Sequence, residues 1–252
     1  FHNGQEMKAE DVAASMHYWL GLSAKAQTLI GGSTFKADGY YTVKLTVNQP
    51  SSDIIMILAS PIQFAAVYPK SVVEGAGETG IKEYIGTGPY KFEEWIPDQY
   101  VKLVKNPDYQ ASPNADSGLA DAKAAVAETL VYDIVTDPQT RVSGLQDGTY
   151  DIAEEVSSED YEALSEDSDI NIMVNNGGTL NLFLNTTEGI MAKKEMRQAV
   201  LAAFNCDDIR KASYGSEYLY EVNNGWCVPT DAQWGPDAGN EYYNQNDVDK
   251  AN

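Results

Sequence analysis

The chain contains only two histidines, His2 and His17, and this limits the acid–base chemistry that it could perform. A Ser-His-Asp triad requires a histidine as its general base. His2 stands beside the turn signal Asn3-Gly4, and His17 lies on a helical pattern close to Trp19. Both settings are typical of structural histidines, so the sequence does not indicate a triad hydrolase.

Paired carboxylates could act as general acid and base, as they do in glycoside hydrolases. Glu154-Glu155 and Asp207-Asp208 are adjacent acidic pairs. The chain has 38 acidic and 17 basic residues and a formal net charge of -21, so such pairs are expected by chance. A carboxylate enzyme needs two carboxyl groups in one cleft with separated pKa values. We therefore expect no catalytic residues. The alternative function to consider is that of a secreted carboxylate-dependent hydrolase, such as a glycoside hydrolase.

Residues 75–80 read Gly-Ala-Gly-Glu-Thr-Gly and match the dinucleotide-binding pattern G-x-G-x-x-G. That pattern binds a cofactor only where a strand precedes it and a helix follows it. Glu74 and Glu78 would repel a pyrophosphate, and Gly86 leaves little room for a helix. We interpret the segment as a flexible loop and expect no cofactor.

The chain has two cysteines, Cys206 and Cys227. In an exported protein such a pair predicts one disulfide, whereas in a cytosolic protein it predicts two buried thiols. Both interpretations stay open, and we favour the disulfide. No further cysteine or histidine cluster accompanies the pair, so we expect no metal site.

The acidic composition excludes two classes of partner, because such a surface repels nucleic acid and anionic membranes. No apolar run approaches the roughly 20 residues that cross a bilayer. With 252 residues and 43% hydrophobic content, the chain can build one large domain or two smaller ones. It opens at Phe1 without an initiator methionine, which indicates a processed or truncated fragment.

Strands and helices that would position these residues alternate along the chain. Helices are predicted from Ala9 onward and at residues 138–146, 157–165 and 194–204. Strands are predicted at residues 41–47, 90–95, 100–104, 130–135, 150–153 and 179–185, and residues 53–58 fit either element. Asp137 can cap the second helix, with Pro138 at its first position. This interleaving is typical of the α/β class with mixed sheets.

A rigid turn precedes the strand at residues 90–95. Gly86 and Gly88 can adopt backbone angles that side chains forbid, and Pro89 fixes one dihedral angle. Tyr90, Phe92 and Trp95 then follow. We interpret the turn as a structural corner that delivers a strand, rather than as a cradle for a ligand.

Several segments carry recognisable motifs in a fixed order. They are FHNGQ (1–5) with AEDV (9–12), GTGPY (86–90) with Trp95 and NPDY (106–109), QDGTYDI (146–152), and LFLNT (182–186) with MRQAV (196–200). In order and approximate spacing they resemble family 5 extracellular solute-binding proteins, the oligopeptide, dipeptide and nickel receptors of ABC importers. The chain departs from that family at Lys8 (usually Thr), Gln110 (usually Trp) and Asn205-Cys206 (usually Ala/Asp-Arg). Members of the family are considerably longer than this chain.

The resemblance implies a periplasmic-binding-protein-like type II fold, with two lobes and mixed sheets, here incomplete. Residues 1–168 would form most of the first lobe, without its N-terminal strands, and residues 169–252 would begin the second. The hinge would lie near residues 167–176. The lobes of such receptors close over a ligand, and the closed form docks on a membrane permease.

The implied function is capture of a peptide, nickel chelate, sugar or opine in the cleft between the lobes, with peptides favoured. The intact protein would be a monomer outside the cell, lipid-anchored, or periplasmic where the source has an outer membrane. An adhesion or signalling module that reuses the receptor fold without transport is a further alternative. Candidate ligand-binding residues are Asn176, Thr179, Asn181, Phe183 and Trp226. An ordinary turn would also explain Asn176 and Thr179, and a packing role would also explain Trp226.

Overall fold

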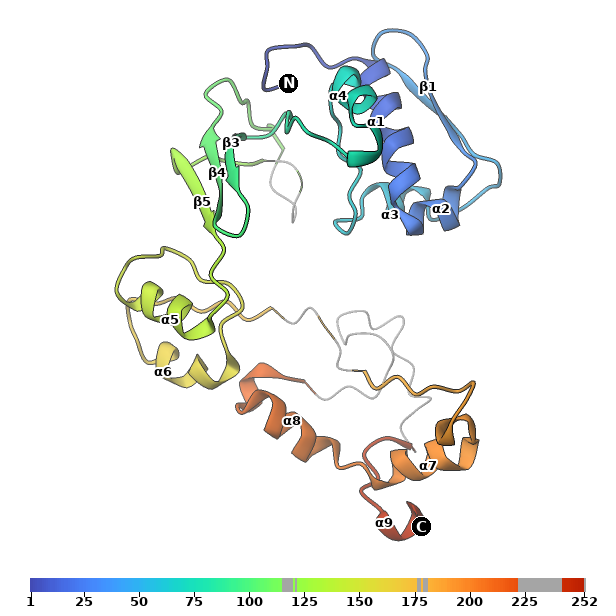
Figure 1. Ribbon diagram of the computed structural model, residues 1–252, viewed down its shortest axis with the longest axis vertical. Coiled ribbons are helices and arrows are strands. Elements are labelled where there is room, and N and C mark those ends of the chain that lie inside the picture. The colour runs from blue at the N-terminus through green and yellow to red at the C-terminus, as the bar shows by residue number, and fades with distance from the viewer. Residues whose placement is uncertain (115–119, 121, 176–177, 179–180, 222–241, 252) are drawn as a thin grey trace. The chain divides into compact units, whose positions relative to one another are not determined.

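The computed structural model describes residues 1–114, 120, 122–175, 178, 181–221 and 242–251. Its contacts divide the chain into two compact units, Phe1–Ile134 and Val135–Asn252 (Figure 1). These compact units are groups of residues in mutual contact, whereas the lobes of a receptor are the parts that move about a hinge. The lobe boundary near residue 168 therefore stays a prediction.

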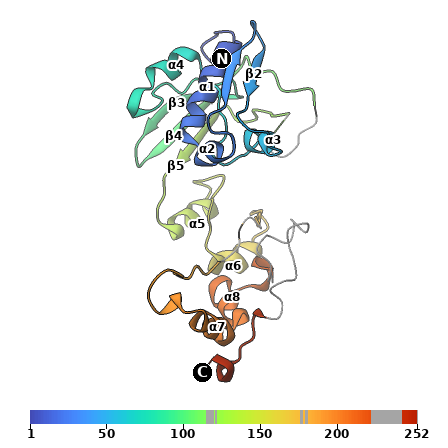
Figure 2. The same ribbon diagram turned by 90° about the vertical axis from the view of Figure 1, so that its right-hand side faces the viewer.

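The first part of unit 1 is a small helical core with a two-stranded hairpin. Its elements are α1 (Ala9–Leu22), α2 (Ala24–Ile30), β1 (Thr34–Ala37), β2 (Val43–Thr46), α3 (Ile54–Leu58) and α4 (Lys70–Gly75). α1 begins at Ala9, where the Asp11 carboxylate accepts the Lys8 backbone N–H at 2.8 Å. The helix dipole also favours the acidic residues of this first turn. α2 contacts both α1 and α3, and Figure 2 shows α3 next to α2.

A buried apolar cluster joins these elements into one core. It contains Met16, Trp19, Ala26, Ile30, Phe35 and Ile57. The ambiguous segment at residues 53–58 contributes to it as a helix, α3. Ile57 is buried there, so packing within this cluster and against α2 decides what periodicity alone could not.

The second part of unit 1 is an antiparallel sheet of β3 (Tyr90–Ile96), β4 (Tyr100–Lys105) and β5 (Thr129–Asp133), in that order. The three predicted strands are confirmed within a few residues at their ends. A bulge between Phe92 and Glu94 shifts the register of β3 against β4. The described strands of both sheets pair antiparallel.

The regular elements among the described residues of unit 2 are helices and short 3₁₀ turns. The α-helices among these residues are α5 (Pro138–Gln146), α6 (Tyr161–Ser165), α7 (Lys194–Ala203), α8 (Cys206–Tyr214) and α9 (Val248–Ala251). α5 has the predicted bounds, because the Asp137 carboxylate accepts the Thr140 N–H at 2.7 Å at its start. α7 packs against α9, as both views show (Figures 1 and 2).

Two predicted strands of unit 2 are not strands in the structure. Residues 150–153 form a loop, because the Tyr150 N–H turns back to the Gly144 carbonyl at 2.9 Å and closes the end of α5. Residues 181–185, the described part of the other segment, are outside any strand. A strand requires a neighbour to complete its ladder of hydrogen bonds. The described residues of unit 2 supply no such neighbour.

The described helices include none that combines the length and the apolar character needed to cross a bilayer.

Candidate functional site

The predicted ligand-binding residues fall mainly on parts of the chain that the structure does not describe. Asn176, Thr179 and Trp226 lie outside the described residues. Asn181 and Phe183 are described, and both are exposed, with Phe183 78% accessible. The role of these five residues in binding therefore stays a prediction.

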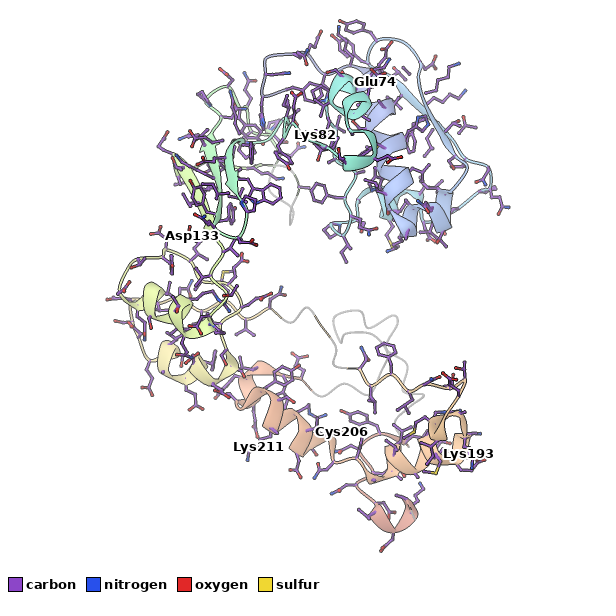
Figure 3. All side chains as sticks on the ribbon, viewed as in Figure 1. Glu74, Lys82, Asp133, Lys193, Cys206 and Lys211 are labelled. Atoms are coloured by element: carbon purple, nitrogen blue, oxygen red, sulfur yellow. The ribbon has the colours of Figure 1, made fainter. Side chains whose placement is uncertain are left out.

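Cys206 is the first residue of α8, where Figure 3 labels it. Its thiol is partly buried and is not in a disulfide with any residue that the structure describes. The Cys206 backbone N–H donates to the Asn244 side-chain oxygen at 2.6 Å. Cys227 lies outside the described residues, so the disulfide stays a prediction.

The acidic pairs do not form an acid–base centre. Glu154, Glu155, Asp207 and Asp208 are all exposed to solvent. Asp207 also forms an ion pair with Arg210 and accepts a hydrogen bond from Asn244 at 2.8 Å. These two pairs therefore give the hydrolase alternative no support.

A small cavity of about 260 Å³ includes two further carboxylates, Glu6 and Asp11. The hydrogen bond from the Tyr41 hydroxyl is the largest cause that lowers the pKa of Glu6. A general acid needs a raised pKa instead. Asp11 accepts the backbone N–H groups of Lys8 and Lys70, at 2.8 and 2.7 Å, so its oxygens cap helix ends.

Residues 75–80 lack the context of a dinucleotide site. They follow helix α4, which ends at Gly75, rather than a strand. Gly77–Thr79 then form a short 3₁₀ turn. The pattern G-x-G-x-x-G therefore describes a connection between helical turns here.

His2 joins the N-terminal turn to the Gly-Thr-Gly-Pro loop. The Gly86 backbone N–H donates to His2 Nδ1 at 3.2 Å, so Nδ1 is an acceptor and carries no proton. Nε2 therefore carries the proton and donates it to the Gly88 carbonyl at 3.0 Å. The His2 backbone N–H adds a third bond, to the Gly86 carbonyl at 2.8 Å.

Asn106 ties a third motif segment to the same loop. Its side-chain amide donates to the Gly88 carbonyl at 3.3 Å, and its backbone N–H donates to the Pro89 carbonyl at 2.8 Å. Three motifs that are distant in sequence thus meet at one corner. Gly86 and Gly88 do not have positive φ angles, so the conformational freedom expected of these glycines is not used here.

A cavity of about 350 Å³ lies beside this corner. It is lined by Phe1, His2, Gly4, Thr87, Lys91, Asn106, Asp108, Tyr109 and Gln110. Lys91 and Asp108 form an ion pair across 3.7 Å. Small-molecule pockets are mostly apolar with a few polar groups. The polar lining here fits a solvated notch next to a structural corner.

A surface that the sequence analysis missed lies on α3 and the loop that follows it. Ile55, Met56, Ile62 and Phe64 are 76%, 65%, 78% and 66% exposed, and we call these four residues the α3 surface. The sequence contained one signal of this surface: residues 54–69 include no charged residue, although the chain is strongly charged. The described residues contain no group of three or more His, Cys, Asp or Glu that could hold a metal ion.

Comparison with known proteins identifies the family. The whole chain, residues 1–252, matches the middle region of the bacterial extracellular solute-binding proteins, family 5. The chain belongs to this family. The motif order that predicted it is therefore confirmed.

The curated relatives of this family-5 chain include binding proteins of peptides. The oligopeptide-binding protein AppA of Bacillus subtilis is 24% identical over 250 residues, which cover 92% of this chain and 42% of AppA. The glutathione-binding protein GsiB of Salmonella choleraesuis is 27% identical over 176 residues, 69% of this chain and 32% of GsiB. The chain thus spans less than half the length of these relatives.

Solved structures confirm the type II fold of this family-5 chain. AgaA of A. tumefacien R10, solved with agropinic acid, matches with a TM-score of 0.76 and 25% identity, over 99% of this chain and 48% of AgaA. DppA of Helicobacter pylori, solved with the peptide STSA, matches with a TM-score of 0.74 and 23% identity, over 98% of this chain and 49% of DppA. The α/β class and the incomplete extent that the sequence predicted are both consistent with these matches.

Proposed function

We propose that the chain is part of the solute-binding receptor of an ABC importer, and that the receptor captures peptides. The family match over residues 1–252 is the observation that carries the proposal. The packing of three family motifs around His2 and Asn106 supports it, because the motif residues hold the fold together. The receptor binds its ligand and performs no chemistry on it.

Peptides are favoured over opines and chelates as the ligand class. The curated relatives include proteins named for oligopeptide and glutathione binding. AgaA, which was solved with agropinic acid, makes an opine the second candidate. The receptor delivers its ligand to a membrane permease, acts as a monomer outside the cell and is held there by a lipid anchor, or works in a periplasm.

The test is mass spectrometry of the full-length protein purified without denaturation. A co-purified peptide, and rebinding of a synthetic copy after its removal, are the expected results. An opine or a metal chelate in its place would exclude the peptide class. Hydrolysis of a bound peptide or glycoside at a rate that scales with protein concentration would contradict the absence of catalysis.

A further inference from the structure

His17 connects α1 to the hairpin of β1 and β2 through a hydrogen bond. β1 lies beside α1 (Figure 1), and the Phe35 backbone N–H donates to His17 Nε2 at 3.0 Å. The two rings also meet edge to face, with their centroids 6.1 Å apart. Because Nε2 accepts, the single proton of the neutral imidazole is on Nδ1. The His17 side chain is exposed, so protons reach it without unfolding of the core.

The Phe35 N–H is a group that the hairpin cannot satisfy by itself. The Asp38 N–H donates to the Thr42 carbonyl at 2.7 Å, which identifies these two residues as a hydrogen-bonded pair. Hydrogen-bonded pairs alternate with pairs that have no such bonds, and the register makes Phe35 and Leu45 a pair of the second kind. The Phe35 N–H therefore points to the free edge of the hairpin. Since a two-stranded hairpin is marginally stable alone, its attachment to α1 matters.

The face of the hairpin that packs on α1 offers no charge to a protonated His17. Phe35 and Leu45 share this face and pack in the apolar core. Lys36 and Lys44, the charged residues of the two strands, pair with each other on the opposite face and are exposed. The residues one turn from His17 in α1 are all uncharged, namely Ala13, Ala14, Leu20 and Gly21.

Charged groups on the other elements that pack against α1 have their own partners. Lys70 of α4 forms ion pairs with Glu10 at 3.2 Å and with Glu74 at 3.9 Å. Glu10 lies about 10 Å before His17 along the helix axis. Lys25 of α2 is exposed. At the tip of the hairpin, the hydroxyls of two tyrosines donate to a carboxylate that precedes α1, namely Tyr40 and Tyr41 to Glu6.

We propose that His17 makes the attachment of the β1–β2 hairpin to α1 sensitive to pH. A protonated imidazole donates from both nitrogens and accepts with neither, so protonation breaks the bond from Phe35 and sets two N–H groups against each other. An imidazole takes up its proton between about pH 7 and about pH 5. The attachment is therefore complete above this range and weakens as the pH falls through it. This property goes beyond the proposed function and does not depend on the ligand class.

Hydrogen exchange of the full-length protein at about pH 7.5 and about pH 5, corrected for the intrinsic pH dependence of amide exchange, tests the proposal. His17→Gln is the matched variant, because the glutamine side-chain oxygen can accept the same N–H and does not titrate. His17→Ala removes the acceptor at every pH. Strand β4 is the control segment, since it belongs to the other sheet of unit 1.

In the wild type, the protection of residues 34–46 should fall about 3- to 10-fold between the two pH values, and that of β4 less than about 2-fold. His17→Gln should keep wild-type protection of the hairpin at the higher pH and lose none of it in acid. His17→Ala should show weaker protection at both pH values and no response to acid. A wild-type hairpin that does not respond to acid would overturn the proposal. A response that persists in either variant would assign the effect to other groups and overturn it too.

Discussion

The imidazole of His2 accepts the backbone N–H of Gly86 at 3.2 Å and donates to the carbonyl of Gly88 at 3.0 Å. One side chain thus satisfies a donor and an acceptor of the same loop. The two partners are 84 and 86 residues away in the sequence. His2, which would be a first candidate for a catalytic residue, therefore connects two family motifs by hydrogen bonds.

Removal of the His2 side chain should destabilise the Gly-Thr-Gly-Pro loop. His2→Ala loses two side-chain hydrogen bonds, and we expect a loss of about 1–2 kcal/mol in the free energy of unfolding, measured in urea. Hydrogen exchange over residues 86–90 should become several-fold faster. Lys25→Ala, at an exposed position of α2, should change neither quantity. Unchanged hydrogen exchange over residues 86–90 in His2→Ala would show that His2 does not stabilise this loop.

Gly144 should tolerate no side chain. A Cβ atom at this position of α5 would lie 2.4 Å from ring carbons of Tyr150, so the ring or the helix has to move. We expect Gly144→Ala to lower the free energy of unfolding by about 1–3 kcal/mol. Gly21→Ala is the matched control in α1, because nothing lies within 4 Å of its new Cβ. It should stabilise the protein by about 0.5–1 kcal/mol.

The Tyr150→Ala variant separates steric overlap from other effects of Gly144→Ala. In that background the ring is absent, so Gly144→Ala should cost much less than in the wild type. Equal costs in the two backgrounds would contradict the overlap between the new Cβ and the ring.

Helix α5 should weaken in acid. Hydrogen bonds from the Thr140 side chain and backbone N–H lower the pKa of Asp137 from its ordinary value of 3.8. Because the folded-state pKa is lowered, this stabilisation is complete above the unfolded-state pKa and is lost as the pH falls through the folded-state pKa. Hydrogen exchange in α5 should be constant down to about pH 5 and accelerate below about pH 4.

Asp137→Asn tests the origin of this pH dependence. Asparagine is an equally good cap but does not titrate in this range, so the acceleration in α5 should become smaller. Asp137→Ala should instead weaken α5 at every pH. An unchanged pH profile in Asp137→Asn would assign the effect to other carboxylates.

Trp19 should be needed to hold the loop of the α3 surface. Trp19→Phe keeps an aromatic ring in the core but removes the donor to the Gln63 carbonyl. We expect hydrogen exchange over residues 60–66 to accelerate, with about 1–3 kcal/mol lost in stability. Gln63→Gly relieves the left-handed φ and should be neutral or stabilising. If Trp19→Phe leaves this loop unchanged, the hydrogen bond does not determine its conformation.

Local signals in the sequence predicted α5 well. Asp137 and Pro138 mark its start, and Asp147-Gly148 marks its end, where Gly148 has a φ of 78°. α8 was not predicted, although Asn205 caps it by accepting the N–H groups of Asp207 and Asp208 at 3.1 Å. Asn205, with Asp207 and Asp208 in the first turn after it, was the available signal.

Long-range packing explains what the sequence did not reveal. Five successive apolar residues form α3, and only packing in the core cluster decides that Ile57 is buried while Ile55 and Met56 are exposed. The pattern at residues 181–185 alternates as in a strand, yet a strand also needs a neighbour to pair with. Of the candidate ligand residues, only Asn181 and Phe183 are described, so binding by the five stays a prediction.

The disulfide prediction has a direct check. Thiol titration of the unreduced, unfolded protein should find no reactive thiol if Cys206 and Cys227 are paired. Two titratable thiols would show that the predicted Cys206–Cys227 disulfide does not form.

Calorimetric titration of the full-length protein with a peptide that co-purifies with it tests the central claim most directly. The account predicts saturable binding of one peptide per protein molecule, with the peptide recovered intact after hours of incubation. Absence of binding by any co-purified or synthetic peptide, or recovery of the peptide as cleaved products, would contradict a peptide receptor that performs no chemistry.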